Sequence, residues 1–252
     1  MIKKLNLHEW FLIYQLEYIE KNYAHLNMHL EVDISKICDH FTHSKIPMST
    51  ILVKASGLWL ESTPLVRKQI FKTIFGKRLY INEHNSVTVP IVLNNDGEKY
   101  VSIMNIENVA NKTLSDISSE FKQYSTTQPK TLPIGKNIIG KKNNFFNRTR
   151  LKLIHFTVNN FPSIQDKYKV GTVSVSSLLK FDEAMADVTP TAKGPGAMTI
   201  CITTVVLESK KMKLGVAWAH QTGDGYAGVQ ACQKLCHILQ GNDEELFKRL
   251  LN

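Results

Sequence analysis

The sequence lacks a long apolar run. Nowhere in its 252 residues does an uncharged apolar stretch reach the length of a membrane-spanning helix. The start, Met1 to Lys4, has the positive charge of a secretory signal, but His8 and Glu9 interrupt the apolar run that would have to follow, and no small-residue cleavage site appears. We therefore expect cytoplasmic localisation and no membrane partner.

Cysteine is scarce, and no pair has the C-x-x-C spacing of a zinc or redox site. The four cysteines are Cys38, Cys201, Cys232 and Cys236. Three potential ligands, Cys232, Cys236 and His237, lie close together on one expected helix, but a structural zinc site requires four. We therefore expect reduced thiols that pack in the core, and no metal.

Acidic residues are fewer than basic ones, 22 against 31, which gives a formal charge of +9. Such a charge can indicate nucleic-acid binding, but the basic residues are spread thinly and carry no recognition motif. We expect no nucleic-acid partner, because a basic surface equally suits the phosphates of coenzyme A or an acidic carrier protein. The densest basic patch comprises Lys136, Lys141, Lys142, Arg148, Arg150 and Lys152.

Apolar periodicity and turn residues predict a single domain of mixed α/β structure over residues 1–252, without an internal repeat or a low-complexity linker. Expected helices cover residues 9–26, Pro47 to Pro64, Thr113 to Phe121 and Gly225 to Leu239. Expected strands cover residues 28–34, 79–81, 87–93, 100–103, 172–178, 198–207 and 213–220. Residues 126–149 are polar, basic and punctuated by Gly and Pro, which indicates a loop or lid, with Ile138, Ile139, Phe145 and Phe146 packed.

The sharpest local pattern is H-x-x-x-D-G, which spans His220 to Gly225 at the junction of an expected strand and an expected helix. A strand end fixes the backbone of His220 while its side chain points into a cleft, and neutral imidazole can remove a proton from a hydroxyl or thiol at neutral pH. Asp224 with Gly225 suits a tight turn that caps the next helix and holds the loop. A buried histidine beside an ordinary Asp-Gly turn explains the motif alone equally well.

Several segments in the same order resemble the catalytic domain of the 2-oxoacid dehydrogenase acyltransferases and chloramphenicol acetyltransferase. They are Leu30 to Ile34, Ser86 to Val92, Val101 to Phe121, Gly171 to Leu178 (G-T-V-S-V-S-S-L, similar to G-T-F-T-I-S-S/N-L) and His220 to Gly225. The resemblance covers most of the chain and implies a chloramphenicol-acetyltransferase-like two-layer sandwich with a mixed sheet, assembled as a homotrimer.

The resemblance also implies a site between subunits, with the general base His220 from one chain and an oxyanion-binding hydroxyl, Ser176, from the next. Ser174 shares the face of Ser176 by strand alternation, so the choice of Ser176 rests on the resemblance. Asp224 holds the loop. The donor would be a coenzyme A thioester or an acyl carrier protein, and no permanently bound cofactor is implied.

Two features depart from the family pattern. Ala219 and Gln221 flank the histidine where relatives often have Asp or His before it and Arg after it, and residues 1–66 contain no Arg to pair with Asp224.

No lipoyl domain, subunit-binding domain or Ala/Pro-rich linker precedes the catalytic region. The interpretation is therefore a stand-alone acyltransferase that acts on the hydroxyl of a small molecule, for example a polyketide or tetronate.

Two alternatives stay open. One is acyl transfer to a lipoyl or carrier thiol, as in the dehydrogenase complexes. The other is a catalytically silent trimeric scaffold, against which the retention of His220, Asp224 and Ser176 counts.

Overall fold

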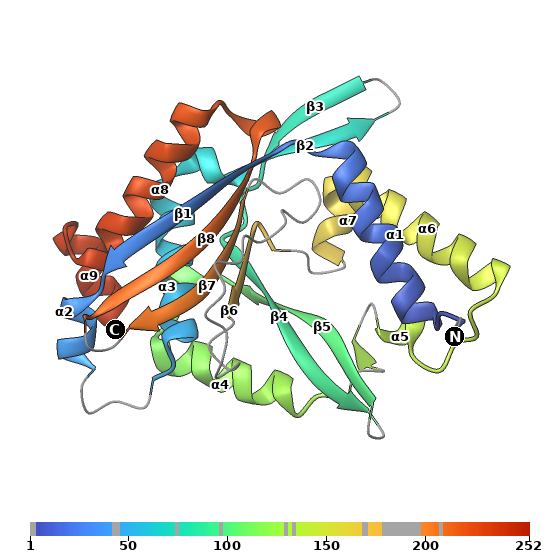
Figure 1. Ribbon diagram of the computed structural model, residues 1–252, viewed down its shortest axis with the longest axis horizontal. Coiled ribbons are helices and arrows are strands. Elements are labelled where there is room, and N and C mark those ends of the chain that lie inside the picture. Colours follow the sequence, from blue (N-terminus) through green and yellow to red (C-terminus); the bar gives the residue numbers. More distant parts are fainter. Residues whose placement is uncertain are drawn as a thin grey trace.

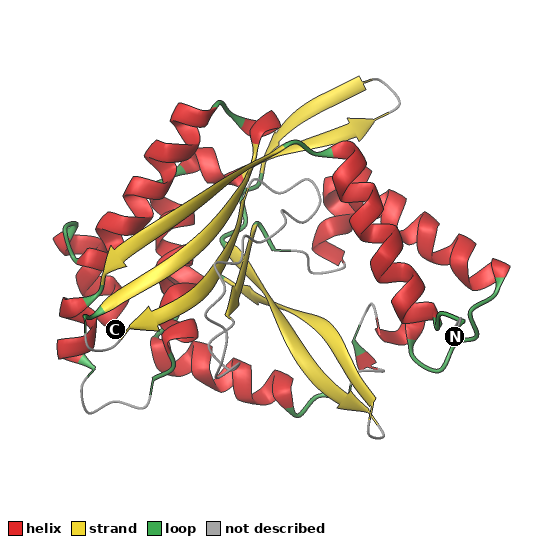
Figure 2. Ribbon diagram, in the orientation of Figure 1, coloured by secondary structure: helices red, strands yellow, loops and turns green. Residues whose placement is uncertain are grey.

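A mixed six-stranded sheet runs through the middle of the molecule, with helices gathered on either side of it (Figures 1 and 2). The computed structural model describes residues 4–41, 46–73, 76–95, 98–128, 131–132, 135–167, 171–177, 198–206 and 209–252. The strand order is β1-β8-β7-β6-β4-β5, and β6 runs parallel to both of its neighbours. These strands are β1 (His25–Asp33), β4 (Ser86–Asn95), β5 (Glu98–Glu107), β6 (Val173–Ser177), β7 (Met198–Val206) and β8 (Lys211–Ala219). A separate hairpin pairs β2 (Lys68–Thr73) with β3 (Gly76–Ile81).

Helix starts follow local capping chemistry. Asn6 and Glu9 form a reciprocal capping box at the first helix, and Thr113 and Asp116 form another at the fourth. The α-helices are α1 (Leu7–Asn22), α2 (Ser35–His40), α3 (Met48–Ser62), α4 (Leu114–Ser125), α5 (Gly135–Ile138), α6 (Phe145–Asn160), α7 (Pro162–Lys167), α8 (Gly225–Gln240) and α9 (Glu244–Leu251). Short 3-10 helices are η1 (Pro64–Arg67), η2 (Val109–Asn111) and η4 (His220–Thr222). No helix in these ranges is long and apolar enough to cross a membrane.

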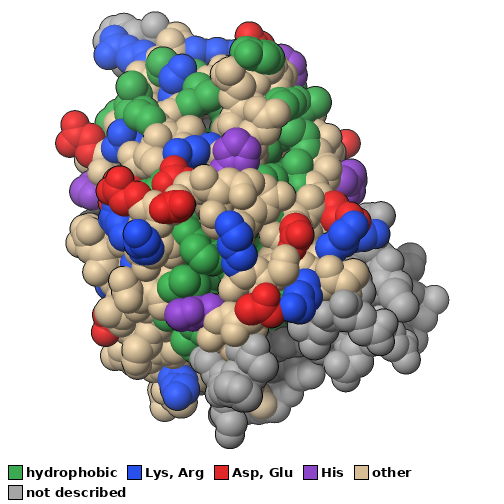
Figure 3. Space-filling model, turned by 90° about the vertical axis from the view of Figure 1, so that its left-hand side faces the viewer, with side chains coloured by type: hydrophobic (Ala, Val, Ile, Leu, Met, Phe, Trp, Pro, Cys, Tyr) green, Lys and Arg blue, Asp and Glu red, His purple; other side chains and the backbone are tan. Residues whose placement is uncertain are grey.

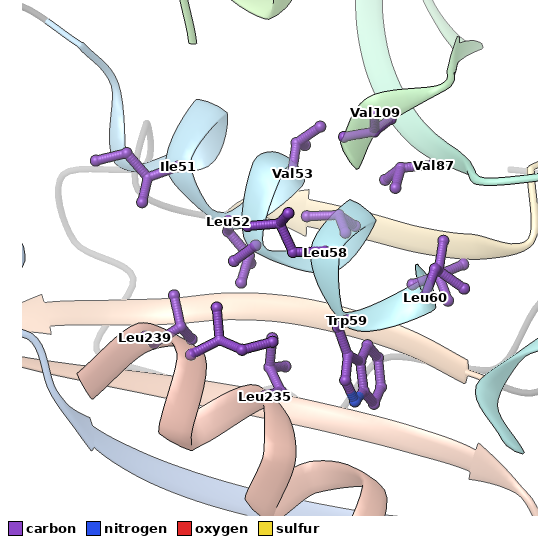
Figure 4. Close-up of a cluster of buried hydrophobic side chains, with 14 of the residues drawn as sticks. Ile51, Leu52, Val53, Leu58, Trp59, Leu60, Val87, Val109, Leu235 and Leu239 are labelled. Carbon is purple, nitrogen blue, oxygen red and sulfur yellow. The ribbon is translucent and has the colours of Figure 1, made fainter. Parts of the chain in front are cut away.

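Helix α3 is the centre of the core. Every residue from Thr50 to Leu60 is buried, and Figure 4 shows Val53 on the side of Val109 and Trp59 on the side of α8. The one charge in this stretch, Lys54, donates from Nζ to the carbonyl oxygens of Ala110 (3.0 Å) and Lys112, and burial lowers its pKa. Gly57 lets η2 approach, since a Cβ there would lie 2.6 Å from Val109 Cγ1.

The two faces of the sheet differ in character because alternate residues of a strand point to opposite sides. On β8, Leu214, Val216 and Trp218 pack in the main core with α3 and α8. The intervening Ala217 and Ala219 point to the opposite face, called the second face below. Ala217 and Ala219 are buried as well, so β8 is covered on both faces.

The predicted mixed α/β class and chloramphenicol-acetyltransferase-like sandwich are confirmed at the level of the fold by this sheet and by the comparisons below. The expected loop or lid at 126–149 is wrong in part, because α5 lies within it and α6 begins at Phe145. The expected elements also omit strand β2 and the helices α2, α7 and α9. Ile138 is packed as expected, but Phe145 and Phe146 are 76% and 81% exposed. Asn144 starts α6 by accepting a hydrogen bond from Asn147 N, a cap that the polar composition concealed.

The cysteines that the structure describes are free thiols. Cys232 is buried, and burial raises its pKa to about 12, while Cys38 and Cys236 are half-buried. The side chain of Cys201 lies outside the described residues. No metal-binding group of His, Cys, Asp or Glu occurs within the described ranges.

Helices α1 and α6 form a pair at the side of the molecule away from α8 and α9 (Figure 1). Their contact is built around His155 of α6, which is 7% exposed. The His155 ring makes edge contacts with Phe11, Tyr14 and Tyr18, at centroid distances of 6.1, 5.3 and 4.6 Å. His155 Nδ1 is buried without a hydrogen-bond partner in the described structure. Burial without a hydrogen-bond partner at Nδ1 favours the neutral imidazole, because the charged form would lose its hydration.

Acid should therefore weaken the fold through His155. Burial lowers the pKa of His155 from 6.5 to about 4. Between these two pKa values the unfolded chain binds a proton at His155 and the folded chain does not. The contribution of neutral His155 to the free energy of unfolding is therefore full above pH 6.5 and is lost as pH falls toward 4. At pH 5 the loss is about 2 kcal/mol. Urea unfolding of the wild type and of His155→Phe at pH 7 and pH 5 measures it. Between pH 7 and pH 5 the free energy of unfolding should fall by about 2 kcal/mol less in the variant than in the wild type. An equal fall in both proteins would contradict this account.

Candidate active site

Strand β8 positions His220. The strand is buried from Leu214 to Ala219, and the chain leaves the sheet immediately afterwards through η4. The side chain of His220 is exposed, while the backbone on either side of it is held in the sheet and the core. A rigid backbone with an accessible imidazole is the arrangement that a general base requires.

Hydrogen bonds hold the His220 loop at the end of α1 and the start of β1. His220 N donates to Ala24 O at 3.0 Å, and Gln221 Nε2 donates to Asn22 O at 2.9 Å. The buried Thr222 donates from Oγ1 to Ala219 O at 2.7 Å. Gln221, which departs from the residue that relatives often have there, thus fastens the loop to the last turn of α1.

Trp218 supports the same loop from the core side. It is fully buried, and its Nε1 donates to Gly223 O at 3.1 Å. A Cβ at Gly223 would lie 3.0 Å from Trp218 Cζ2, and one at Gly228 would lie 3.3 Å from Trp218 Cγ. The loop and the first turn of α8 therefore close over the indole ring because these two positions carry no side chain.

Asp224 is the N-cap of α8. Its Oδ1 accepts a hydrogen bond from Ala227 N at 2.8 Å, and its carboxylate lies at the positive end of the helix dipole. No ion pair to Asp224 is found among the described residues, so within them the carboxylate acts through the helix cap. The capping role expected for Asp224 matches this geometry.

A second histidine lies beside the loop and was missed by the sequence analysis. His25 of β1 is the ladder partner of Ala219, the residue before His220. Its Nε2 is buried without a hydrogen-bond partner in the described structure, and burial lowers the pKa of His25. The signal in the sequence was weak, because His25 starts the strand and falls outside the expected range 28–34.

Ser176 does not meet His220 within one chain. Through the ladder Ser176 is level with Cys201 and Gly215, two strands across from β8 and five residues back from His220. At about 3.3 Å per residue and about 4.8 Å per strand, the two Cα atoms are roughly 19 Å apart. Ser174 is nearer, but it remains beyond hydrogen-bond reach by the same count.

Ser174 belongs to a row of backbone partners that crosses the whole sheet on the second face. In strand order the row is Asn27, Ala217, Thr199, Ser174, Thr88 and Asn105. Ser174, Thr88 and Asn105 are all buried, and Thr88 Oγ1 accepts a hydrogen bond from Gly171 N at 2.6 Å. A Cβ at Gly171 would lie 2.4 Å from that oxygen, so the glycine at the head of G-T-V-S is required by packing.

Structural comparison finds the fold of this chain in known proteins. Dihydrolipoamide acetyltransferase from Azotobacter vinelandii has a TM-score of 0.67 at 14% identity, covering 98% of this chain and 94% of the other. The 2-oxoacid dehydrogenase catalytic core from Thermoplasma acidophilum has a TM-score of 0.66 at 13% identity, covering 96% and 99%. A chloramphenicol acetyltransferase has a TM-score of 0.50 at 11% identity, covering 95% and 100%. No family model matches the sequence, and no curated protein matches it.

At these identities the likeness establishes the fold. The resemblance inferred from the sequence is therefore confirmed as a likeness in structure to both expected groups of proteins. The match extends over nearly the whole of each compared chain.

The capping role of Asp224 predicts a split between two substitutions. Asp224→Ala removes the acceptor for Ala227 N and should lower the free energy of unfolding by about 1 kcal/mol. Asp224→Asn keeps a good capping group and should cost much less. Urea denaturation of both variants measures the difference. Equal losses would mean that the negative charge, and not the cap, is what the loop needs.

Proposed function

We propose that this chain is an acyltransferase that moves an acyl group, most simply acetyl, from coenzyme A or an acyl carrier protein to the hydroxyl of a small molecule such as a polyketide or tetronate. The observation that carries the proposal is the exposed His220 on a backbone held by the core, within an H-x-x-x-D-G loop and a fold shared with acyltransferases. The donor is a substrate, and the chemistry requires no resident cofactor.

His220 acts as the general base. Its imidazole removes the proton of the acceptor hydroxyl as the oxygen attacks the thioester carbonyl carbon. The carbonyl oxygen becomes an oxyanion in the tetrahedral intermediate. When the intermediate collapses, the carbon–sulfur bond breaks and the thiolate leaves, taking the proton back from His220. One ester forms and one thioester is lost, so the enzyme ends in its starting state.

Ser176 stabilises the oxyanion by donating a hydrogen bond that is made chiefly in the transition state. Because Ser176 and His220 of one chain are roughly 19 Å apart by the ladder count, the serine comes from a neighbouring copy. We place the site between adjacent subunits of a homotrimer, as the resemblance implied. Each trimer then holds one site at each of its interfaces.

The Azotobacter vinelandii structure supports this assignment of roles. That structure concerns the role of a serine, a histidine and an asparagine in the catalytic mechanism of dihydrolipoamide acetyltransferase. The asparagine follows the histidine by four positions. Here Asp224 follows His220 by the same spacing, and Ser176 precedes it in the chain. Asn and Asp are both strong N-caps, so the residue at this position can hold the loop in either protein.

Transfer to a thiol is the second candidate. Compared proteins named dihydrolipoamide acetyltransferases favour it, and the acceptor would then be a lipoyl or carrier-bound thiol supplied by another protein. The same His220 would remove the thiol proton. A catalytically silent scaffold is less consistent with an accessible His220 on a loop held by several hydrogen bonds.

Loss of His220 should abolish turnover without unfolding the protein. With acetyl-coenzyme A and a panel of hydroxylated metabolites, free thiol release should fall about 100- to 10000-fold in His220→Ala. The exposed ring of His220 contributes little to packing, so the thermal midpoint should be unchanged. The matched control is His29→Ala, which removes an exposed histidine of strand β1 and should leave turnover unchanged. Turnover with dihydrolipoamide but no hydroxyl acceptor would favour the thiol reading. Equal turnover by wild type and His220→Ala would overturn the assignment of the base.

Mixed trimers test whether two chains share each site. His220→Ala and Ser176→Ala should each have low activity. The turnover rate of Ser176→Ala should be about 100- to 1000-fold below that of the wild type. When the two variants are unfolded together and reassembled in equal amounts, about a quarter of the interfaces should unite an intact histidine with an intact serine. Activity should then rise to about a quarter of the wild-type value. No recovery, with mixed trimers demonstrated by differently tagged chains, would contradict a shared site.

A further inference from the structure

Helix α6 presents an apolar surface that nothing in the described structure covers. Leu151 and His155 face α1 and are buried, whereas Phe145, Phe146, Leu153 and Phe156 are exposed, by 76%, 81%, 61% and 51% respectively. At 100° per residue the four exposed positions fall within an arc of about 100° on the opposite side of the helix. Helix α6 is therefore apolar on both sides, and its outer side is unusual for a surface in water.

The chain segment that contains this surface is strongly basic. Between Glu120 and Asp166 the sequence contains eight Lys and Arg residues and no Asp or Glu. The rest of the chain is nearly neutral, since this segment accounts for eight of the formal +9 charges. Lys141, Lys142, Arg150 and Lys152, which precede or lie on α6, are all exposed.

The opposite side of the molecule has no such bias. Figure 3 views the side formed by α8, α9 and α2, where basic and acidic side chains are interspersed. Ion pairs such as Lys234–Asp243 (2.6 Å) and Arg249–Glu61 (2.6 Å) belong to that part of the chain. The excess of positive charge thus belongs to the segment that contains the aromatic surface, and Lys141, Lys142, Arg150 and Lys152 lie on or just before α6 itself.

We propose that the outer side of α6, from Phe145 to Phe156, binds the surface of an anionic membrane. An interfacial helix inserts a row of apolar side chains among the lipid headgroups, while Lys and Arg beside it pair with lipid phosphates. Two adjacent phenylalanines at the start of α6 protrude almost completely, which suits insertion into a bilayer better than contact with a rigid protein. The lack of a spanning segment, on which the expectation of no membrane partner rests, does not exclude binding at the surface of a bilayer.

The attachment of α6 to the rest of the fold suits this role. Its inner side is fixed to α1 by the aromatic box at His155, and Arg148 lies over the Trp10 ring at 5.2 Å. Arg150 donates from Nη2 to Asn137 O at 2.8 Å, which joins α6 to the segment before it. The helix is therefore folded before any contact with lipid, and binding would not require the ordering of a flexible segment.

Sedimentation of the full chain with lipid vesicles tests the proposal. The wild type should bind vesicles of equimolar phosphatidylcholine and phosphatidylserine, bind phosphatidylcholine alone far more weakly, and release as salt is raised. Phe145→Ser/Phe146→Ser should weaken partition onto the anionic vesicles about tenfold or more. Val92→Ser/Val101→Ser removes a similarly exposed apolar pair from the β4–β5 hairpin and should leave partition unchanged.

Three results would overturn the proposal. They are no binding of the wild type to anionic vesicles, equal binding to neutral ones, and equal loss in the control pair. Sedimentation velocity without lipid is measured in parallel. If Phe145→Ser/Phe146→Ser changes the oligomeric state while the wild type ignores vesicles, the surface is an interface between copies of this chain.

Discussion

The burial of Trp218 fixes the part of the molecule on which the candidate site depends. The indole ring belongs to the main core, and its only polar atom is satisfied by Gly223 O, inside the loop that follows His220. Because a buried N–H without a partner is costly, the ring and the loop hold each other in one arrangement. The glycines at 223 and 228 let the loop and α8 close on the ring. A residue that looks like ordinary core in the sequence thus sets the backbone position of the proposed base.

The sheet separates stability from chemistry. One face of β8 and β6 carries Val216, Trp218, Val173 and Val175 into the core. The second face carries Ser174 and Ser176 on β6 and the small residues Ala217 and Ala219 on β8, and Ser174, Ala217 and Ala219 are buried. The same alternation that stabilises the fold keeps serine hydroxyls in a row on the other side. The distance between these serines and His220 of the same chain is set by the strand register, so a change of side-chain rotamer cannot bring them into hydrogen-bond contact.

Local chemistry explains what the sequence predicts well. The start of the helix near Thr113, the strand β1 and the strand-to-helix change at His220 depend on neighbouring residues, so their patterns are readable without a fold. Strand β2 and helix α6 were missed for a different reason. Helix α6 has apolar residues on both sides, so its periodicity is blurred, and the basic residues around it resemble a loop. The box around His155 joins residues more than a hundred positions apart, and no local pattern reveals that contact.

Helix α1 connects the proposed base to the outer side of α6. Its last turn receives the side chain of Gln221 at Asn22 O, and its middle packs around His155 through Tyr14 and Tyr18. One helix therefore lies against both the His220 loop and the inner side of α6. If α6 lies on a membrane, this connection fixes the orientation of the His220 loop relative to the lipid surface. If the proposed acyl transfer is correct, an acceptor or acyl donor that partitions into the membrane would then reach the site from a defined side, which would give the apolar outer side of α6 a role in that reaction.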